Sequence, residues 1–192
     1  MTPDLLAKAT EAKIADANKY CQPLIEAMDR FEIQSPNQRA AFIGGTIAIE
    51  STHLSKVEED LYYKDPQYLA NTYKRVFSGN PDRARPYTRN SKALGDLLYQ
   101  GFWGRGLIQL TWRKNYELAG TYLGFDYVAN PDLLTEPWHA AMTAGWYWND
   151  RACNRPADRG DMDRVTELVN GPAKMHLAKR KAGFALALNV GV

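Results

Sequence analysis

The run "NQRAAFIGGTIAIES", residues 37–51, limits the folds open to this chain more than any other segment. Its apolar residues recur at helical spacing, and very few polar side chains interrupt them. Ser35 followed by Pro36 is typical of a helix start. Gly44 and Gly45 lie in the middle of the run, where small residues permit close packing. We therefore predict a helix buried deep in the core and packed tightly against a neighbour.

Helical periodicity and helix-start residues recur along the rest of the chain, and no alternating series of strands is present. Further helices are expected over residues 20–31, 65–77, 91–100, 112–123, 137–148, 162–169 and 178–188. Asp65 and Asp161 are the expected N-caps of two of them. Only "GLIQLTW" (106–112) and, more weakly, "LYY" (61–63) favour short strands. The predicted fold is mainly α, with at most a small β-hairpin.

Length and composition indicate a soluble globular protein. A chain of 192 residues with 45% apolar residues fits one catalytic domain over residues 1–192, without a separate wall-binding module. The first twenty residues lack the basic-then-apolar pattern of a signal peptide, and no apolar run approaches the ~18 residues of a membrane helix. We expect synthesis in a cytoplasm and no membrane insertion.

No residue pattern predicts a metal or another cofactor. Cys21 and Cys153 are far apart in the chain and form no CxxC pair, so free thiols are expected. His53, His139 and His176 are scattered and belong to no Cys/His cluster.

The charge is uneven although the net charge is only +2. Residues 71–92 carry six basic side chains against Asp82 alone. The basic residues are Lys74, Arg75, Arg83, Arg85, Arg89 and Lys92. Such a segment can contact a polyanion, or it can be an ordinary solvated surface.

Glu50 is the polar residue that the apolar run does not explain. It follows Ala48 and Ile49 at the end of that run. A carboxyl group buried without a charged partner keeps its proton to higher pH, as a general acid at neutral pH requires. The alternative is a glutamate that faces solvent at a frayed helix end.

A second carboxylate comes from the acidic cluster Glu58, Glu59 and Asp60. On one unbroken helix Glu50 and Glu59 would face opposite sides, about 13.5 Å apart in rise. The poor helix formers of "STHLS" (51–55) instead predict a bend that returns Glu59 toward Glu50. Two carboxylates that flank a cleft are typical of glycoside hydrolysis.

Several segments together resemble glycoside hydrolase family 19, which contains chitinases and many bacteriophage lysozymes (endolysins). They are "AIESTHLSKVEEDLYY", "GFWGRGLIQLTWRKNY", "NPDLLTEP" followed by "AAMTAGWYW", and "VNG". The resemblance extends over roughly residues 20–188. It implies a lysozyme-like, mainly helical fold with two lobes around a substrate groove.

The resemblance also implies roles for single residues. Glu50 matches the general acid, Glu59 the general base of an inverting reaction, and Thr111 the hydroxyl that positions water. Glu58 remains an alternative second carboxylate, because the alignment there shifts easily by one residue. The substrate-binding residues implied are Gln109, Asn115, Tyr116, Asn170, Arg180 and Tyr63.

Some of these residues also have ordinary structural explanations. Thr111 can cap the helix that follows it, Asn170 can end a helix, and Gln109 can satisfy a buried backbone group. On a strand, Gln109 and Thr111 would share the face that forms the groove floor. Four of the five tryptophans are expected in the core, and they are Trp103, Trp112, Trp146 and Trp148.

The substrate prediction depends on the missing export signal. The absence of such a signal favours a phage or prophage endolysin, expected to be a monomer, that cleaves the β-1,4 glycan backbone of peptidoglycan. Such an enzyme would be made in the host cytoplasm and would reach the periplasm and cell wall after holin-dependent release. The alternatives are a chitinase acting on chitin oligomers and a lytic transglycosylase. A non-enzymatic cell-wall-binding or nucleic-acid-binding module is a further alternative, although the acidic pair would have no role in it and no nucleic-acid partner is predicted.

Overall fold

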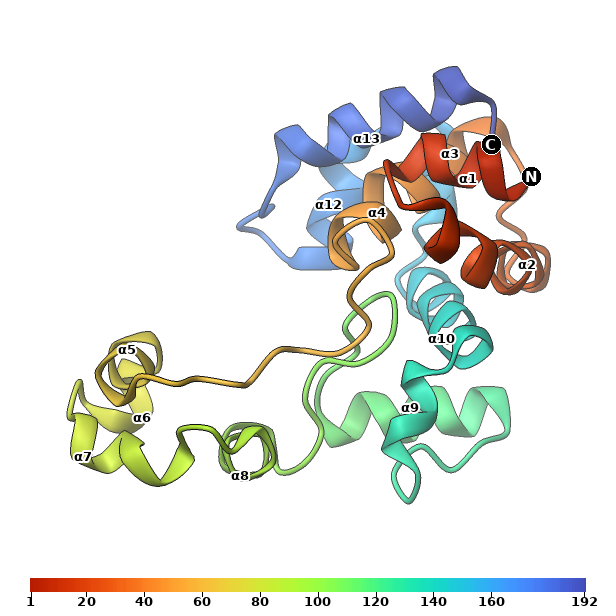
Figure 1. The fold of residues 1–192 in the computed structure, drawn as a ribbon. Coiled ribbons are helices and arrows are strands. Elements are labelled where there is room, and N and C mark those ends of the chain that lie inside the picture. The colour runs from red at the N-terminus through yellow and green to blue at the C-terminus, as the bar shows by residue number, and fades with distance from the viewer.

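The computed structural model describes all 192 residues as helices joined by loops, without a regular β-strand (Figure 1). Most helices gather in one larger lobe. They are α1 (Pro3–Thr10), α2 (Ile14–Arg30), α3 (Pro36–Phe42), the π-helix η1 (Ile43–Ile47), α4 (Ala48–Glu50), α9 (Arg113–Leu123), the 3-10 helix η3 (Pro131–Thr135), α10 (Pro137–Asp150), α11 (Asn154–Asp158), α12 (Met162–Asn170) and α13 (Leu177–Val190). The smaller lobe holds α5 (Pro66–Thr72), α6 (Lys74–Phe77), α7 (Pro81–Ala84), the 3-10 helix η2 (Arg85–Tyr87) and α8 (Ser91–Tyr99).

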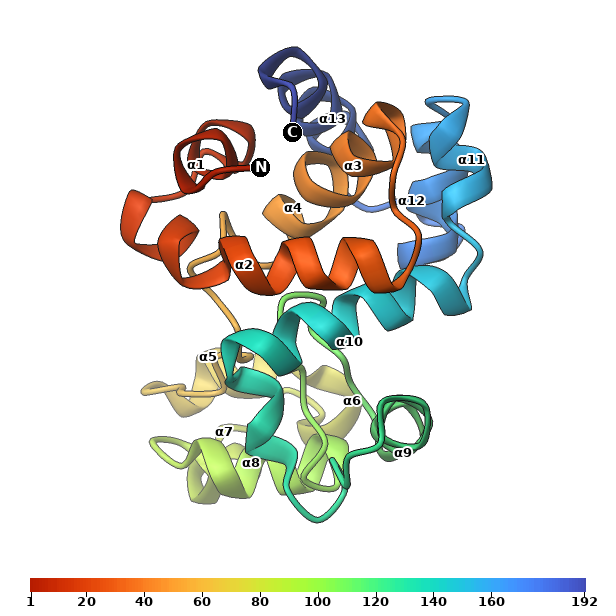
Figure 2. The ribbon, with the colours of Figure 1, turned by 90° about the vertical axis from the view of Figure 1, so that its right-hand side faces the viewer.

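Each lobe has its own hydrophobic core. The larger core involves α1–α3 and α9–α13, and a separate cluster of six buried residues lies among α5–α8. Figure 1 shows α5–α8 set apart from the other helices, with extended segments leading into and out of them, and in Figure 2 they lie below α1–α4 and α11–α13. The expected mainly helical, two-lobed fold is confirmed. None of the helices is both long and apolar enough to cross a membrane.

The helix starts predicted from cap residues are confirmed. The side chains of Ser35, Asp65 and Asp161 each accept a hydrogen bond from a backbone N–H two or three residues further on. The helix expected from Asp65 to residue 77 is interrupted at Tyr73, whose backbone leaves the helical region, so α5 and α6 are two short helices.

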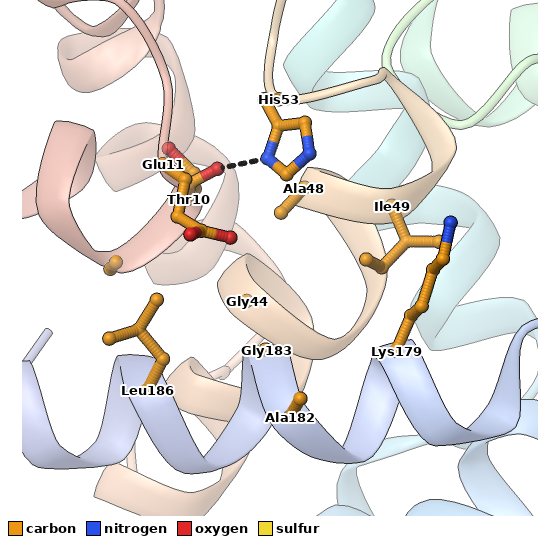
Figure 3. A pocket seen from close by; sticks show the side chains of 11 residues that line it. Thr10, Glu11, Gly44, Ala48, Ile49, His53, Lys179, Ala182, Gly183 and Leu186 are labelled. Carbon is orange, nitrogen blue, oxygen red and sulfur yellow. Dashed lines mark hydrogen bonds between the residues drawn. The ribbon is translucent and has the colours of Figure 1, made fainter.

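The apolar run 37–51 is a continuous helical stretch in which η1 interrupts regular α-helix between α3 and α4. Gly44 in η1 and Gly183 in α13 lie directly opposite one another (Figure 3). A Cβ atom on either glycine would collide with the backbone oxygen of the other. The close packing predicted for the glycines of this run is therefore a helix–helix contact, and it seats the helix of Glu50 against α13.

Replacing Gly183 with alanine tests this contact. In an ordinary helix interior the change stabilises the fold by about 1 kcal/mol. Here we expect the sign to reverse, with a loss of about 1–3 kcal/mol, because the new methyl group must displace backbone atoms. Urea unfolding of Gly183→Ala measures the loss. Ala185→Gly on the exposed side of α13 is the control for helix propensity alone, and a more stable Gly183→Ala protein would contradict the contact.

The two predicted strands are wrong. Residues 106–109 form a turn that an isolated bridge between Arg105 and Leu110 closes, with φ of 78° at Gly106 and 51° at Gln109. Residues 61–63 are irregular. Alternating apolar residues suggested a strand, but the left-handed backbone at both ends of the turn is incompatible with one.

Candidate active site

A left-handed turn separates the two candidate carboxylates. Glu50 is the last residue of α4, and residues 52–54 then all have positive φ values, between 50° and 63°. The chain next runs antiparallel to residues 104–106, with Glu58 bridged to Arg105. The predicted bend at 51–55 is confirmed, and it carries Glu59 out of the larger lobe toward the smaller one.

The carboxylate of Glu50 contacts two side chains from the larger lobe. Arg180 of α13 donates from Nη2 to Glu50 Oε1, and Asn170 at the end of α12 donates from Nδ2 to the same oxygen at 3.3 Å. The guanidinium of Arg180 is buried and also donates to the backbone oxygens of Gly45 and Met175. The side chain of Glu50 remains 16% exposed. Glu50 is therefore ion-paired and open on one edge, which differs from the unpaired burial that the apolar run suggested.

The carboxylate of Glu59 is held from the opposite side. The hydroxyl of Tyr99 donates to Oε1 at 2.9 Å, and the backbone N–H of Gly104 donates to Oε2 at 3.3 Å. The N–H of Glu59 in turn donates to the carbonyl oxygen of Gly104 at 2.8 Å. Since Tyr99 ends α8, the smaller lobe supplies the side-chain support for this carboxylate.

Gly104 brings Glu59, Gln109 and Thr111 together. A Cβ atom on Gly104 would lie 3.0 Å from Gln109 Oε1 and 3.5 Å from Thr111 Oγ1. The hydroxyl of Thr111 donates to the backbone oxygen of Gln109 at 2.9 Å, and the amide of Gln109 donates to that of Gly106 at 3.0 Å. The glycine leaves room for three polar side chains, and the turn fixes two of them.

Glu58 faces different neighbours from Glu59. Its carboxylate accepts a hydrogen bond from Trp103 Nε1 at 2.8 Å and lies 3.4 Å from Arg105 Nε. Arg105 is buried, pairs with Asp132 at 3.2 Å and lies over the ring of Trp103. Glu58 is thus part of a structural ion-pair cluster.

Tyr116, expected to bind substrate, belongs to the core. It is fully buried, donates its hydroxyl hydrogen to the backbone oxygen of Trp103 at 2.6 Å, and accepts from Arg105 at 3.1 Å. No surface of Tyr116 remains for a sugar, so this expectation is wrong. The polar hydroxyl group of a tyrosine suggests a surface position, but here hydrogen bonds to Arg105 and to the backbone of Trp103 allow Tyr116 to be buried.

This burial has a measurable consequence at alkaline pH. Burial raises the pKa of Tyr116 to about 12, whereas an unfolded tyrosine ionises near pH ~10. The folded state therefore binds the phenol proton of Tyr116 more tightly than the unfolded state does. The resulting contribution to the free energy of unfolding is complete below pH ~10 and is lost as the pH rises toward ~12. We expect about 3 kcal/mol of the unfolding free energy to be lost over that range. Urea unfolding at several pH values measures it. The decline should be shallower in Tyr116→Phe, and an equal decline would contradict the assignment.

The remaining predicted residues lie at the edges of the site. Asn115 donates to the backbone oxygen of Thr111 at 2.8 Å, so it supports Thr111. Tyr63 lies in the smaller lobe, with its ring centre 5.9 Å from that of Tyr73. Asn170 both ends α12 and contacts Glu50, and Thr111 does not cap α9.

The tryptophans divide into two groups. Trp146 and Trp148 are buried as expected, and Trp103 is half-buried. Trp112 is 53% exposed, which corrects the expectation of a core residue.

A separate hollow lies behind the helix of Glu50, between α1 and α13 (Figure 3). It is lined by small and apolar residues together with His53, Glu11 and Lys179. His53 Nδ1 lies 2.6 Å from the backbone oxygen of Thr10, which links the turn after Glu50 to α1. Neither candidate carboxylate lines this hollow, so the hollow is not part of the candidate site.

Comparison with known proteins assigns the site to a family. The sequence profile of glycoside hydrolase family 19, described as chitinase class I, matches residues 40–191. That span includes both glutamates and every side chain that contacts them. The chain belongs to family 19.

Curated relatives within family 19 match part of the chain. The acidic 27 kDa endochitinase of Solanum lycopersicum is 37% identical over 97 residues, which cover 50% of this chain and 38% of that enzyme. Chitinase 11 of Oryza sativa subsp. japonica is 37% identical over 90 residues, which cover 46% of this chain and 34% of that enzyme. The matches thus span well under half the length of these relatives.

Solved family 19 structures share the fold. Chitinase C from Streptomyces griseus HUT6037 superposes with a TM-score of 0.65 at 21% identity, covering 98% of this chain and 75% of that one. Another bacterial family 19 chitinase gives a TM-score of 0.60 at 20% identity, covering 97% and 94%. At these identities the similarity shows the fold alone.

Proposed function

We propose that the chain hydrolyses β-1,4-linked N-acetylhexosamine polymers of the chitin type by inverting general acid–base catalysis. The observation that carries the proposal is the pair of glutamates held from opposite lobes. Glu50 is bound by Arg180 of the larger lobe, and Glu59 by Tyr99 of the smaller one. Each carboxylate has its own fixed environment, as the two roles in glycoside hydrolysis require. Relatives named endochitinases support chitin as the substrate class.

Glu50 is the proposed general acid. It donates its proton to the glycosidic oxygen as the bond to the anomeric carbon breaks, and it becomes a carboxylate. Arg180 and Asn170 both donate to its Oε1, which leaves Oε2 to carry the proton, and they stabilise the negative charge once that proton has been given up. The exposed edge of the side chain is the route by which the glycosidic oxygen reaches it.

Glu59 is the proposed general base. It removes a proton from a water molecule that attacks the anomeric carbon from the face opposite the leaving group. Because the hydroxyl hydrogen of Thr111 already points at Gln109, its oxygen lone pairs remain free to accept a hydrogen bond from that water. A water bound to both Thr111 and Glu59 presents a lone pair to the substrate.

Peptidoglycan is a second candidate substrate, because the smaller lobe is basic. Four cations of residues 71–92 form no ion pair, whereas Arg85 and Lys92 are paired with nearby aspartates. The four are Lys74, Arg75, Arg83 and Arg89. An anionic cell wall would be attracted to this lobe, and salt would weaken the attraction. On this candidate function the chain is an endolysin released from a host cytoplasm through a holin lesion.

One experiment separates the two candidates. Chitohexaose and purified peptidoglycan sacculi are offered to the enzyme in parallel, at low and at high salt. Products are read by mass spectrometry and by NMR of the new reducing end. We expect hydrolysis of chitohexaose with the α-anomer formed first and little dependence on salt. Hydrolysis of sacculi alone, suppressed by salt, would replace chitin with peptidoglycan. Anhydro-muramic ends would contradict hydrolysis.

A further inference from the structure

Tyr99 is the one side chain that donates a hydrogen bond to the carboxylate of Glu59, and the family resemblance assigned it no role. We propose that Tyr99 is a positioning residue for the general base, and that Trp112 keeps Tyr99 in place. The inference rests on the proposed function, because it concerns the orientation of the base for its water. Tyr99 itself is not proposed to touch the substrate.

The position of Tyr99 follows from how α8 packs. Gly95, one turn earlier in α8, lies flat against the ring of Trp103, and a Cβ atom there would collide with that ring. Trp103 in turn donates to Glu58 at 2.8 Å. The same helix thus fixes the aromatic donors of two consecutive glutamates. Trp103 donates to Glu58 and Tyr99 donates to Glu59, so each of the two carboxylates has its own aromatic donor.

Trp112 covers the outer side of Tyr99. The two ring centres lie 5.3 Å apart at an interplanar angle of 63°, an edge-to-face contact. Trp112 has φ of 77° and ψ of 137°, a conformation that is costly for a bulky residue. It is nevertheless 53% exposed, so burial of the indole does not explain the strain. Contact with Tyr99, directly after the water-positioning Thr111, does explain it.

Tyr99 is a donor over the whole neutral pH range. Burial and the hydrogen bond to Glu59 raise the pKa of Tyr99 to about 12, so the phenol keeps its proton. Tyr73 also keeps its proton, because burial and the neighbouring phenol of Tyr63 raise its pKa. The carboxylate of Glu59 accepts a hydrogen bond from the Tyr99 hydroxyl on Oε1 and another from the Gly104 N–H on Oε2, and the two bonds together fix its plane. Its remaining lone pairs then point in set directions.

The test compares Tyr99→Phe with wild type. The change removes the hydroxyl group and leaves the ring to pack on Trp112. We expect kcat/KM on the substrate identified above to fall about tenfold, the size of one hydrogen bond to a charged group. We also expect the fall to lie in kcat with KM unchanged, because Tyr99 orients the base and does not touch the substrate. Tyr87→Phe is the matched control, since Tyr87 packs on Phe77 in the same lobe and should leave both readouts unchanged.

The possible results separate this inference from the proposed function. Loss of activity in Glu59→Gln together with a wild-type kcat in Tyr99→Phe would overturn the inference alone. A raised KM with an unchanged kcat would also overturn it, because a merely structural role in shaping the smaller lobe predicts that result. A wild-type protein inactive on both glycans would overturn the proposed function and the inference with it. Trp112→Ala should also lower kcat, and a wild-type kcat there would remove Trp112 from the proposal.

Discussion

Replacing Glu50 with glutamine is expected to lower kcat on the polymer by about 10²–10⁴-fold, the usual contribution of a general acid. Glutamine has nearly the same shape as glutamate but carries no transferable proton. Its amide oxygen can still accept from Arg180 and Asn170, so the geometry around position 50 should survive. Initial rates on chitohexaose measure the loss.

The same change should also cost stability. Arg180 is buried, and Glu50 is the one carboxylate that pairs with it. A buried cation that loses its counter-charge destabilises a fold, here by on the order of 2 kcal/mol because neutral oxygens of Gly45, Met175 and Asn170 remain bonded to it. Circular dichroism and urea unfolding of Glu50→Gln are therefore needed beside the rates, which should be compared at a temperature where both proteins are fully folded.

An activated substrate separates catalysis from folding. A dinitrophenyl chitooligosaccharide has a leaving group that departs without a proton, so the general acid is not required. Glu50→Gln should cleave it within about tenfold of the wild-type rate, since most of the general acid's contribution is then no longer needed. An equal loss on both substrates would show that Glu50 maintains the site and does not supply the proton.

The features predicted from sequence were those with local causes. Ser35, Asp65 and Asp161 start helices because their side chains bond backbone groups only two or three residues away. The bend after Glu50 was predicted because a straight helix would have separated the glutamates. Gly44 was correctly placed in a close contact, although its partner Gly183 lies 139 positions further on and could not be named from the sequence.

The surroundings of the glutamates depend on distant contacts that no local pattern contains. Arg180 was placed near the carboxylates only through the family resemblance, since 130 positions separate it from Glu50. Tyr99 was missed because the end of α8 gives no sign of which residue it will meet. Arg105 lies within the glycine-rich motif, but the motif does not show that its side chain both donates to the Tyr116 hydroxyl and pairs with Glu58. Residues 106–109 form a turn and not the predicted strand, because the positive φ angles of Gly106 and Gln109 are incompatible with a strand despite the alternating apolar residues.

Replacing Glu59 with glutamine should have the complementary effect. We expect a loss of about 10²–10⁴-fold on chitohexaose and an equal loss on the dinitrophenyl substrate, because both reactions need an activated water. Stability should change little, since Glu59 is half-buried, pairs with no cation, and leaves an amide oxygen that can accept from Tyr99. The two glutamines thus differ on the activated substrate, and this difference assigns acid and base independently of any sequence alignment.

Glu58→Gln is the matched control for the second carboxylate. It changes the adjacent residue by the same atoms, but its partners are Trp103 and Arg105 and not the groups beside Thr111. We expect kcat to stay within a few-fold of wild type. The urea midpoint should fall only slightly, because the buried Arg105 loses one carboxylate but keeps Asp132.

Azide provides a final test of the base. In Glu59→Ala the anion can enter the space of the missing carboxylate and attack the anomeric carbon without a base, so rates should recover with an α-glycosyl azide as product. A β-azide would mean that attack occurs from the leaving-group face, and it would contradict inversion. Glu59→Ala that remains active without azide, with Glu58→Gln inactive, would move the base to Glu58. If both variants remained active, Glu50 would be the sole catalytic carboxylate, as in the transglycosylase alternative.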